Sequence, residues 1–227
     1  MRLMQALESG RVNIGDYVEY PNSERLILVS ADDSGYEEDQ TLRNSSLYWK
    51  IVRYNGRICL LGEGTLPELY LSGKKGYENA IHILNRICDE LFSNEFGKSK
   101  SLNLEIYKAL PTDMKKIDKL IYWLATLYEH LEAKKQYCIC LASRCGVYGG
   151  RLYAEDGYIG VSKAGVRPVV CLKSNIKVRI NEGDGSKKRP WKLEIEEQTA
   201  ISKEKLSQVI TELEKTLYDL RKIYEKM

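Results

Sequence analysis

The sequence predicts an α+β protein with short antiparallel strands, two helices in the body of the fold and one further helix at the C-terminus. Three observations predict this fold class. The pair Asn55-Gly56 separates two apolar runs, which is typical of a tight hairpin. Apolar residues recur at three- and four-residue spacing over 76–92, which indicates an amphipathic helix. Beyond residue 136, short apolar runs alternate with glycine turns, which favours strands.

The first third of the chain predicts one short helix followed by strands. The apolar residues of 2–9 share one helical face, and Gly10 ends that helix. Both central residues of a type I′ turn need positive φ, so the runs on either side of Asn55-Gly56 are expected to pair. We therefore expect a strand at 17–20, an exposed acidic loop over 31–46, and hairpin strands at 48–54 and 57–62.

Two helices are expected in the middle of the chain. The first covers 76–92. The second covers 113–133, because Pro111 and Asp113 give a start signal and the apolar residues that follow again recur every three or four positions. These apolar residues are Ile117, Leu120, Ile121, Leu124, Leu127, Tyr128 and Leu131.

The segment Gly165-Val166-Arg167-Pro168 leads into an unbroken apolar run, which predicts a buried strand. Pro168 lacks an amide donor, so it suits the first position of a strand. Arg167 stands at the start of that strand, where its five donors can tie several loops together, and we expect a structural role for it. The strands expected in this part of the chain are 137–142, 147–154, 158–162, 166–172 and 176–180.

The end of the chain has a different pattern. Residues 181–190 are rich in glycine and charged residues and predict a flexible boundary, and a linker with a short strand extends to residue 200. Spacings of four and three between apolar residues then predict a coiled-coil helix over 201–227. A helix packed on its own domain is the alternative, because Val209 and Ile223 widen the apolar stripe. The predicted oligomerisation residues are Leu206, Ile210, Leu213, Leu217, Leu220 and Tyr224.

Composition argues against several classes of protein. A net charge of +3 argues against a nucleic-acid partner that is held by bulk charge. No apolar run approaches the length that spans a bilayer, so no membrane partner is expected. The first ten residues lack the apolar centre of a secretion signal. The six cysteines are therefore expected to remain thiols in the cytoplasm.

The sequence contains no recognisable catalytic constellation, so we predict neither an enzyme nor a cofactor. It has no phosphate-binding glycine loop and no Gly-x-Ser-x-Gly turn. Cys138, Cys140 and Cys145 supply three thiols, but a structural zinc site takes four ligands. The histidines, His82 and His130, are distant in sequence. No metal site is predicted.

Four parts of the chain carry a resemblance to a known family. They are Trp49-Lys50-Ile51-Val52, Leu69-Tyr70-Leu71-Ser72-Gly73 with Gly76-Tyr77-Glu78-Asn79-Ala80, Leu141-Ala142-Ser143-Arg144, and Gly165-Val166-Arg167-Pro168. Their order and spacing resemble an uncharacterised domain family common in phages and prophages of Gram-positive bacteria. Cys140 stands where that family usually has Trp.

After the N-terminal helix over 1–10, which the apolar pattern predicts, the resemblance implies a C-type-lectin-like fold over 11–180. It implies structural roles for Trp49, Arg144, Arg167 and Pro168. In related domains, the segment that corresponds to 145–163 forms the variable surface. Here that segment is rich in tyrosine, and aromatic rings can stack on sugars while charged side chains bond sugar hydroxyls. The predicted carbohydrate-binding residues are Tyr148, Arg151, Tyr153, Glu155, Asp156 and Tyr158.

From this resemblance we expect a non-enzymatic virion structural protein, assembled in the host cytoplasm, that decorates a capsid or tail surface. Its expected partners are further copies of itself through the C-terminal helix, phage capsid or tail proteins, and bacterial surface glycan. Two alternatives stay open. One is a tail-associated receptor-binding protein for which the glycan contact is the main purpose, and the other is an enzyme carried by a prophage. The tyrosine-rich face can also be a loop surface that contacts protein or nothing.

Overall fold

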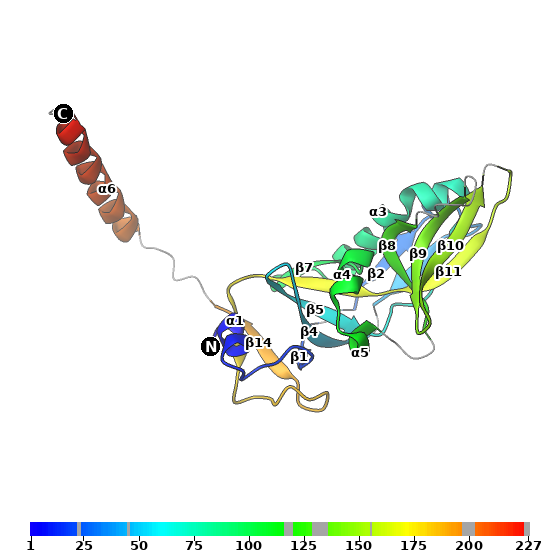
Figure 1. Ribbon diagram of the computed structural model, residues 1–227, viewed down its shortest axis with the longest axis horizontal. Coiled ribbons are helices and arrows are strands. Elements are labelled where there is room, and N and C mark those ends of the chain that lie inside the picture. Colours follow the sequence, from blue (N-terminus) through cyan, green and yellow to red (C-terminus); the bar gives the residue numbers. More distant parts are fainter. Residues whose placement is uncertain are drawn as a thin grey trace. The chain divides into compact units, whose positions relative to one another are not determined.

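The computed structural model describes residues 1–21, 24–44, 46–115, 120–128, 136–154, 156–196 and 203–224. The chain divides into two units, Met1–Ile195 and Glu196–Met227. The first unit contains two main sheets and one long helix (Figure 1). The described part of the second unit contains the helix α6 (Lys203–Tyr224).

The larger sheet of the first unit has seven strands. They are β1 (Tyr17–Glu19), β4 (Tyr48–Tyr54), β5 (Arg57–Glu63), β7 (Gly97–Ser101), β12 (Pro168–Leu172), β13 (Ile176–Arg179) and β14 (Trp191–Ile195). Their order is β13-β14-β1-β4-β5-β12-β7. The hairpin β4–β5 turns at Asn55 and Gly56, whose φ angles of 47° and 73° suit a type I′ turn, so the predicted hairpin is confirmed. Strand β12 lies between β5 and β7 and pairs antiparallel with both.

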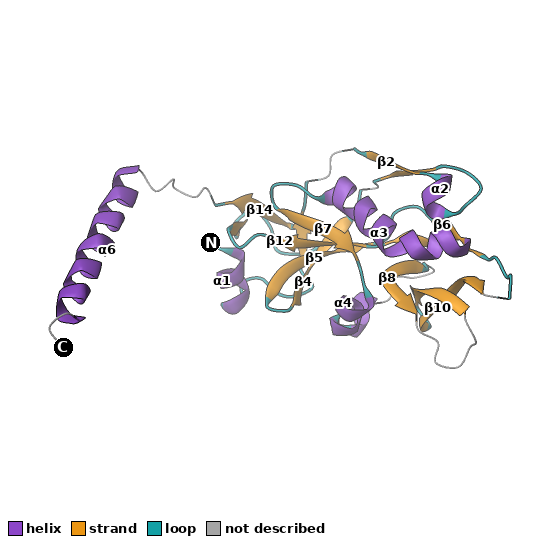
Figure 2. Ribbon diagram, turned by 90° about the horizontal axis from the view of Figure 1, so that it is seen from above, coloured by secondary structure: helices purple, strands orange, loops and turns teal. Residues whose placement is uncertain are grey.

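The smaller sheet has five strands in the order β10-β9-β8-β11-β6. They are β6 (Leu69–Ser72), β8 (Tyr122–Tyr128), β9 (Gln136–Ser143), β10 (Gly146–Ala154) and β11 (Val161–Val166). The segment before β11 also turns back to β10, because Ala154 N donates to Tyr158 O at 3.0 Å and Gly160 N donates to Leu152 O at 2.7 Å. A separate pair, β2 (Leu26–Val29) and β3 (Gln40–Arg43), lies near the long helix (Figure 2).

The long helix α3 (Gly73–Phe92) confirms the helix that was predicted over 76–92, and its apolar face forms part of the main core. Trp49 of β4 is buried in the same core, between the rings of Tyr20 and Phe92 at centroid distances of 5.1 and 5.3 Å. A second core cluster lies on the other side of the larger sheet, beneath the short helices that follow β7. The short helices are α1 (Leu3–Glu8), α2 (Ala31–Ser34), α4 (Leu104–Ala109) and α5 (Thr112–Lys115).

Arg167 lies at the junction between the two sheets, since β11 ends at Val166 and β12 begins at Pro168. Its side chain is 3% exposed. It donates from Nε to the carbonyl oxygen of Gly62 at 3.0 Å and from Nη1 to the hydroxyl of Tyr122 at 3.2 Å. Arg167 thus connects β5 of the larger sheet to β8 of the smaller one.

The predicted fold class was wrong. The described part of the chain is mostly β, with three sheets, and is not the predicted C-type-lectin-like α+β core of short strands and two helices with a C-terminal coiled coil. Within the described residues, α3 is the one long helix of the first unit. The seven-stranded sheet also uses strands from both ends of that unit, because β1 pairs in parallel with β14. Residues 181–195 therefore end in a strand of the main sheet.

The helix predicted over 113–133 was also wrong. Residues 122–128 form β8, and α5 covers residues 112–115, while 116–119 and 129–135 lie outside the described residues. The pairing of β8 with β9 shifts register between Trp123 and Leu127. That irregularity interrupts the two-residue alternation of a strand, so the apolar spacing imitates a helix.

The C-terminal helix α6 does not form a coiled coil in this structure. A coiled coil buries its apolar seam, whereas the described apolar side chains of α6 are exposed. The side chain of Leu206 lies outside the described residues. The exposed seam residues are Ile210, Leu213, Leu217, Leu220 and Tyr224.

Candidate functional site

The predicted carbohydrate-binding residues lie on β10 and on the loop from β10 to β11, but they do not form one cluster. Glu155 lies outside the described residues. The other five divide into three groups. Arg151, Asp156 and Tyr158 contact one another, while Tyr153 and Tyr148 each lie elsewhere.

Tyr153 is part of a packed group of three tyrosines. Its ring stacks on that of Tyr137 in β9, with centroids 4.1 Å apart and planes 2° from parallel. Both rings also meet the edge of Tyr77 in α3, at 5.7 and 5.2 Å. This group covers the helix side of the smaller sheet, so Tyr153 serves packing.

A bulge in β10 explains why Tyr153 and Arg151 separate. The pairing of β10 with β9 shifts between Arg151, which is opposite Cys138, and Tyr153, which is opposite Tyr137. Residues two apart in a regular strand share a face, and one extra residue sends the second side chain to the other face. Arg151 therefore points away from the tyrosine group.

The Arg151–Tyr158 pair is the best-formed part of the predicted face. The guanidinium carbon of Arg151 lies 3.7 Å from the ring centroid of Tyr158, a close cation–π contact. The Asp156 carboxylate lies 3.9 Å from Arg151 Nη2 and accepts a hydrogen bond from Tyr158 N at 3.1 Å. Arg151 covers one face of the Tyr158 ring, and Tyr158 as a whole is 43% exposed.

Gly160 leaves room for the Tyr158 ring. A Cβ at Gly160 would lie 2.7 Å from the ring atom Cε1 of Tyr158 and 2.9 Å from the carbonyl oxygen of Arg151, so a larger residue would displace the ring from this position. The neighbouring Ile159 and Val161 are 74% and 54% exposed. Ile159 is opposite Tyr153 in an isolated bridge, so it lies on the side of the strand that Tyr153 occupies. We define the Arg151 face as Arg151, Asp156 and Tyr158.

Tyr148 lies toward the other end of β10, opposite Leu141 of β9. Burial and the nearby thiol of Cys145 raise the pKa of the Tyr148 hydroxyl, so it stays protonated at neutral pH. Three residues of strand, about 10 Å, separate it from Arg151. Tyr148 is therefore no part of the Arg151 face.

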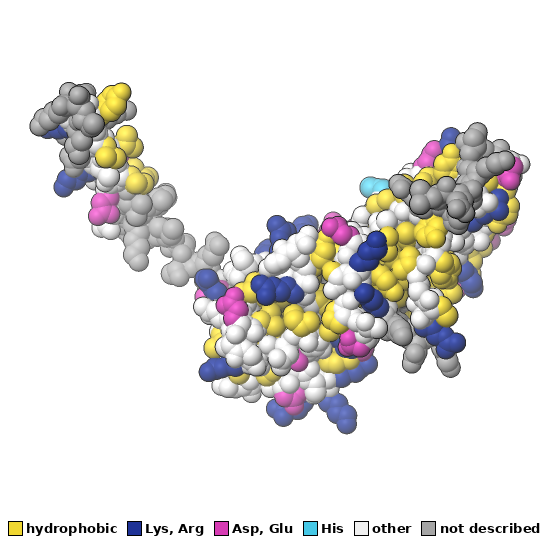
Figure 3. Space-filling view, viewed as in Figure 1, with side chains coloured by type: hydrophobic (Ala, Val, Ile, Leu, Met, Phe, Trp, Pro, Cys, Tyr) yellow, Lys and Arg dark blue, Asp and Glu magenta, His cyan; other side chains and the backbone are white. Residues whose placement is uncertain are grey.

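Apolar side chains are exposed on other parts of the smaller sheet as well. Figure 3 shows apolar side chains with lysines and arginines among them over the region of α4 and β8. Leu120, Ile121 and Leu127 are the exposed apolar residues in and next to β8. This surface mixes apolar and basic groups.

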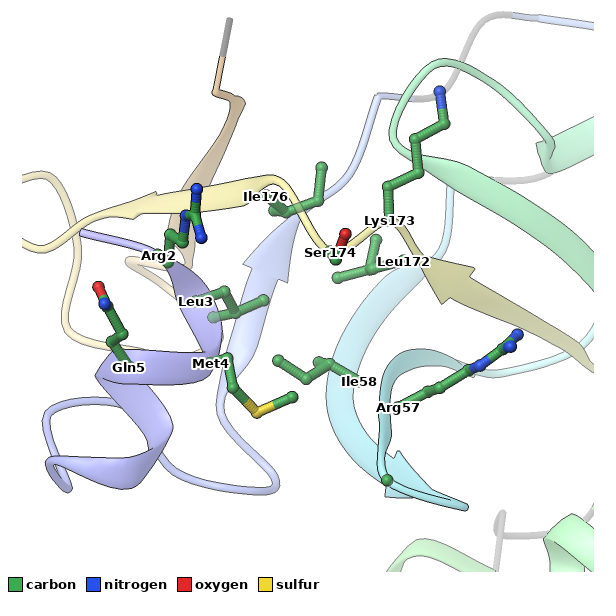
Figure 4. Close-up of a pocket in the computed structure, with 11 residues that line it drawn as sticks. Arg2, Leu3, Met4, Gln5, Arg57, Ile58, Leu172, Lys173, Ser174 and Ile176 are labelled. Carbon is green, nitrogen blue, oxygen red and sulfur yellow. The ribbon is translucent and has the colours of Figure 1, made fainter. Parts of the chain in front are cut away.

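A cleft of about 560 Å³ lies between α1, the tip of the β4–β5 hairpin and the segment that joins β12 to β13. Its apolar side chains converge from three distant parts of the chain, whereas the charged ends of Arg2, Arg57 and Lys173 point away from the centre (Figure 4). These cations do not meet at a common point. The converging residues are Leu3, Met4, Ile58, Leu172 and Ile176.

In the part of the chain that the structure describes, the Arg151 face and the cleft beside α1 bring together no group of side chains suited to catalysis. Among the described residues, no three His, Cys, Asp or Glu side chains come together as metal ligands. The Ser143 hydroxyl accepts a hydrogen bond from Cys145 N at 3.1 Å in the turn between β9 and β10, where it caps the turn. None of the described helices is both long and apolar enough to cross a membrane.

Comparisons with known proteins give no relative of this chain. Its sequence matches no protein-family model and no curated protein, and its fold matches no solved structure.

Proposed function

We propose that this chain is a non-enzymatic protein of a phage particle, which decorates the particle surface and holds bacterial surface carbohydrate at the Arg151 face. The order and spacing of the four segments that resemble the phage and prophage family support the particle assignment. The observation that carries the carbohydrate part is the exposed Tyr158 ring, which is braced by Arg151 and flanked by Asp156.

The Arg151 face offers both kinds of contact that a sugar needs. The apolar face of a pyranose packs on an aromatic ring, and Tyr158 presents the part of its ring that Arg151 leaves open. Guanidinium Nη groups donate to sugar hydroxyls, and the Asp156 carboxylate accepts from them. The stack on Arg151 orders the ring before a ligand arrives, which reduces the entropy cost of binding.

Carbohydrate binding is tested by titrating wall polysaccharide, purified from the bacterium that carries the prophage, into the full chain. Tyr158→Ala and Arg151→Met should each weaken binding by about tenfold, equivalent to about 1.4 kcal/mol. Tyr148→Ala is the matched control, because this tyrosine lies apart from the Arg151 face, and its affinity should equal that of the wild type. Equal losses in all three variants, or no binding by the wild type, would refute the carbohydrate site.

The particle assignment is tested by quantitative mass spectrometry of purified phage particles. A copy number on the scale of a capsid or tube lattice supports decoration. A handful of copies per particle, together with tight glycan binding, supports the second candidate, a tail-associated receptor-binding protein. If the chain is absent from the particles, both the decoration protein and the receptor-binding protein are refuted, and a prophage-encoded protein with another role is left.

A further inference from the structure

Cys59 and Cys171 face each other across two neighbouring strands of the larger sheet. Cys59 of β5 pairs directly with Cys171 of β12, and their Sγ atoms are 3.3 Å apart. Directly opposed residues of antiparallel strands have Cα atoms about 4.5 to 5.5 Å apart. A disulfide accepts Cα separations of about 4.4 to 6.8 Å, so these two thiols can join without a shift of the backbone.

The two thiols differ in how far a reagent can reach them. Cys59 is fully buried, whereas Cys171 is partly exposed. The Cys59 thiol donates a hydrogen bond to Cys171 Sγ. This hydrogen bond, helped by the positive charges of Lys100 and Arg57 and opposed by burial, lowers the pKa of Cys171. The same hydrogen bond and burial raise the pKa of Cys59. Cys171 is thus the thiol that ionises first and the one that solvent reaches.

The pair is separate from the sites described above. Ile58 and Leu172, the chain neighbours of the two cysteines, line the cleft beside α1. Successive side chains of a strand point to opposite faces, so Cys59 and Cys171 lie on the other face of the sheet, within the second core cluster. Neither the cleft nor the Arg151 face uses these thiols.

We propose that Cys59 and Cys171 are a dithiol–disulfide pair that is oxidised by low-molecular-weight disulfides such as glutathione disulfide. The Cys171 thiolate attacks one sulfur of the small disulfide, forms a mixed disulfide and expels one thiolate, which takes up a proton. Cys59 then loses its proton and attacks Cys171 Sγ, which forms the Cys59–Cys171 bond and releases the second small thiol. Two protein thiols are oxidised, and one small disulfide is reduced to two thiols.

Oxidation of this pair would fasten the sheet at its centre. The bond would join β5 to β12, and 112 residues separate the two cysteines in sequence. A covalent link across so long a loop restricts the unfolded chain strongly. The oxidised protein should therefore unfold at a higher temperature than the reduced protein, and a thiol reductant should reverse the change.

The test treats the folded full chain, carrying Cys145→Ser to remove the exposed thiol of the β9–β10 turn, with glutathione disulfide. The protein is then unfolded, its remaining thiols are alkylated with iodoacetamide, and its peptides are mapped by mass spectrometry. We expect a peptide cross-linked through Cys59 and Cys171, and the intact protein, weighed before alkylation, should be lighter than the untreated protein by two hydrogen atoms. Cys88, Cys138 and Cys140 should be fully alkylated after unfolding, because their burial in the folded protein keeps glutathione disulfide away from them.

Two variants separate the roles of the thiols. Cys59→Ser should stop at one glutathione bound to Cys171, and Cys171→Ser should leave Cys59 unmodified. Cys138→Ser is the matched control and should form the cross-link as the parent does. If the parent protein keeps both thiols free, or keeps glutathione on Cys171 without closing the bond, the proposal is wrong. The parent protein alone decides this, so a variant that fails to fold does not affect the result.

Discussion

Arg167 and Tyr122 form the contact that joins the two sheets of the first unit. The guanidinium donates to the Tyr122 hydroxyl at 3.2 Å and lies 5.2 Å from the ring centroid. The hydroxyl in turn donates to the carbonyl oxygen of Lys115 in α5 at 2.5 Å. Because Arg167 also donates to Gly62, three separate parts of the chain depend on one buried side chain. Burial lowers the pKa of Arg167, and the contact with Tyr122 opposes that shift.

Replacing Arg167 with lysine should lower the free energy of unfolding by about 2 kcal/mol, because lysine cannot serve Gly62 O and the Tyr122 hydroxyl together in the same geometry. Urea denaturation measures the change. Arg144→Lys is the control, because Arg144 lies exposed in the β9–β10 turn and its variant should stay within about 0.5 kcal/mol of the wild type. Equal stability of the two variants would contradict a joining role for Arg167.

The ionisation of Glu63 should make the free energy of unfolding depend on pH in the acid range. Burial opposes its ionisation, but hydrogen bonds from Lys187, Tyr17 and Lys50 outweigh burial and lower its pKa from 4.5 to about 2. A carboxylate whose pKa is lower in the folded state stabilises the fold above its unfolded pKa. That stabilisation is lost as the pH falls from 4.5 to about 2.

Glu63→Gln should therefore flatten the fall in melting temperature over this pH range and lower stability at neutral pH. Thermal unfolding at a series of pH values measures both effects. Glu68→Gln is the control, because its ion pair with Lys163 is exposed on both sides and contributes little. A Glu63→Gln variant with the same acid profile as the wild type would show that this carboxylate does not couple to folding.

Tyr153 and Tyr158 should behave in opposite ways, although they lie five residues apart. Tyr153→Ala removes a ring from the group with Tyr137 and Tyr77 and should cost about 3 kcal/mol of stability. Tyr158→Ala removes an exposed ring and should cost less than about 1 kcal/mol while weakening carbohydrate binding. Denaturation and polysaccharide titration on both variants test the division. A Tyr153→Ala variant that is as stable as the wild type but no longer binds carbohydrate would show that Tyr153 serves binding rather than packing.

Local signals in the sequence predicted local structure correctly. Asn55-Gly56 favours the positive φ that a type I′ turn needs at both positions, so the hairpin could be predicted from two neighbouring residues. The apolar face of α3 is regular over its length and was equally readable. Strand β8 was misread, because its register shift near Trp123 depends on its partner β9 and leaves no alternation in its own sequence.

The site was only partly predictable for the same reason. Arg151, Asp156 and Tyr158 lie at one strand end and in the loop that follows it, so they are close in space because they are close in sequence. The bulge that removes Tyr153 from them is defined by pairing with β9. The meeting of Cys59 with Cys171 depends on the pairing of β5 with β12 across 112 residues, which no local pattern encodes.

Replacing Gly165 tests whether packing constrains the segment Gly165-Val166-Arg167-Pro168. A Cβ at this position would overlap the Thr65 side chain and lie 3.0 Å from the carbonyl oxygen of Leu66. Gly165 N donates to Ile121 O at 3.0 Å and Leu66 N donates to Val166 O at 2.9 Å, so neither side can move without losing a backbone hydrogen bond. Gly165→Ala should therefore cost about 2 kcal/mol through overpacking.

A double-mutant cycle identifies the cause of that loss. Thr65→Gly removes the atoms nearest to the new methyl group, so the double variant should be more stable than the sum of the two single changes predicts, by about 1 kcal/mol. Urea denaturation of the four proteins gives this coupling. Simple additivity would mean that Gly165 is needed for its backbone rather than for its contact with Thr65. The remaining cost in the double variant then measures the closer approach to Leu66 O, which no side-chain change at Thr65 relieves.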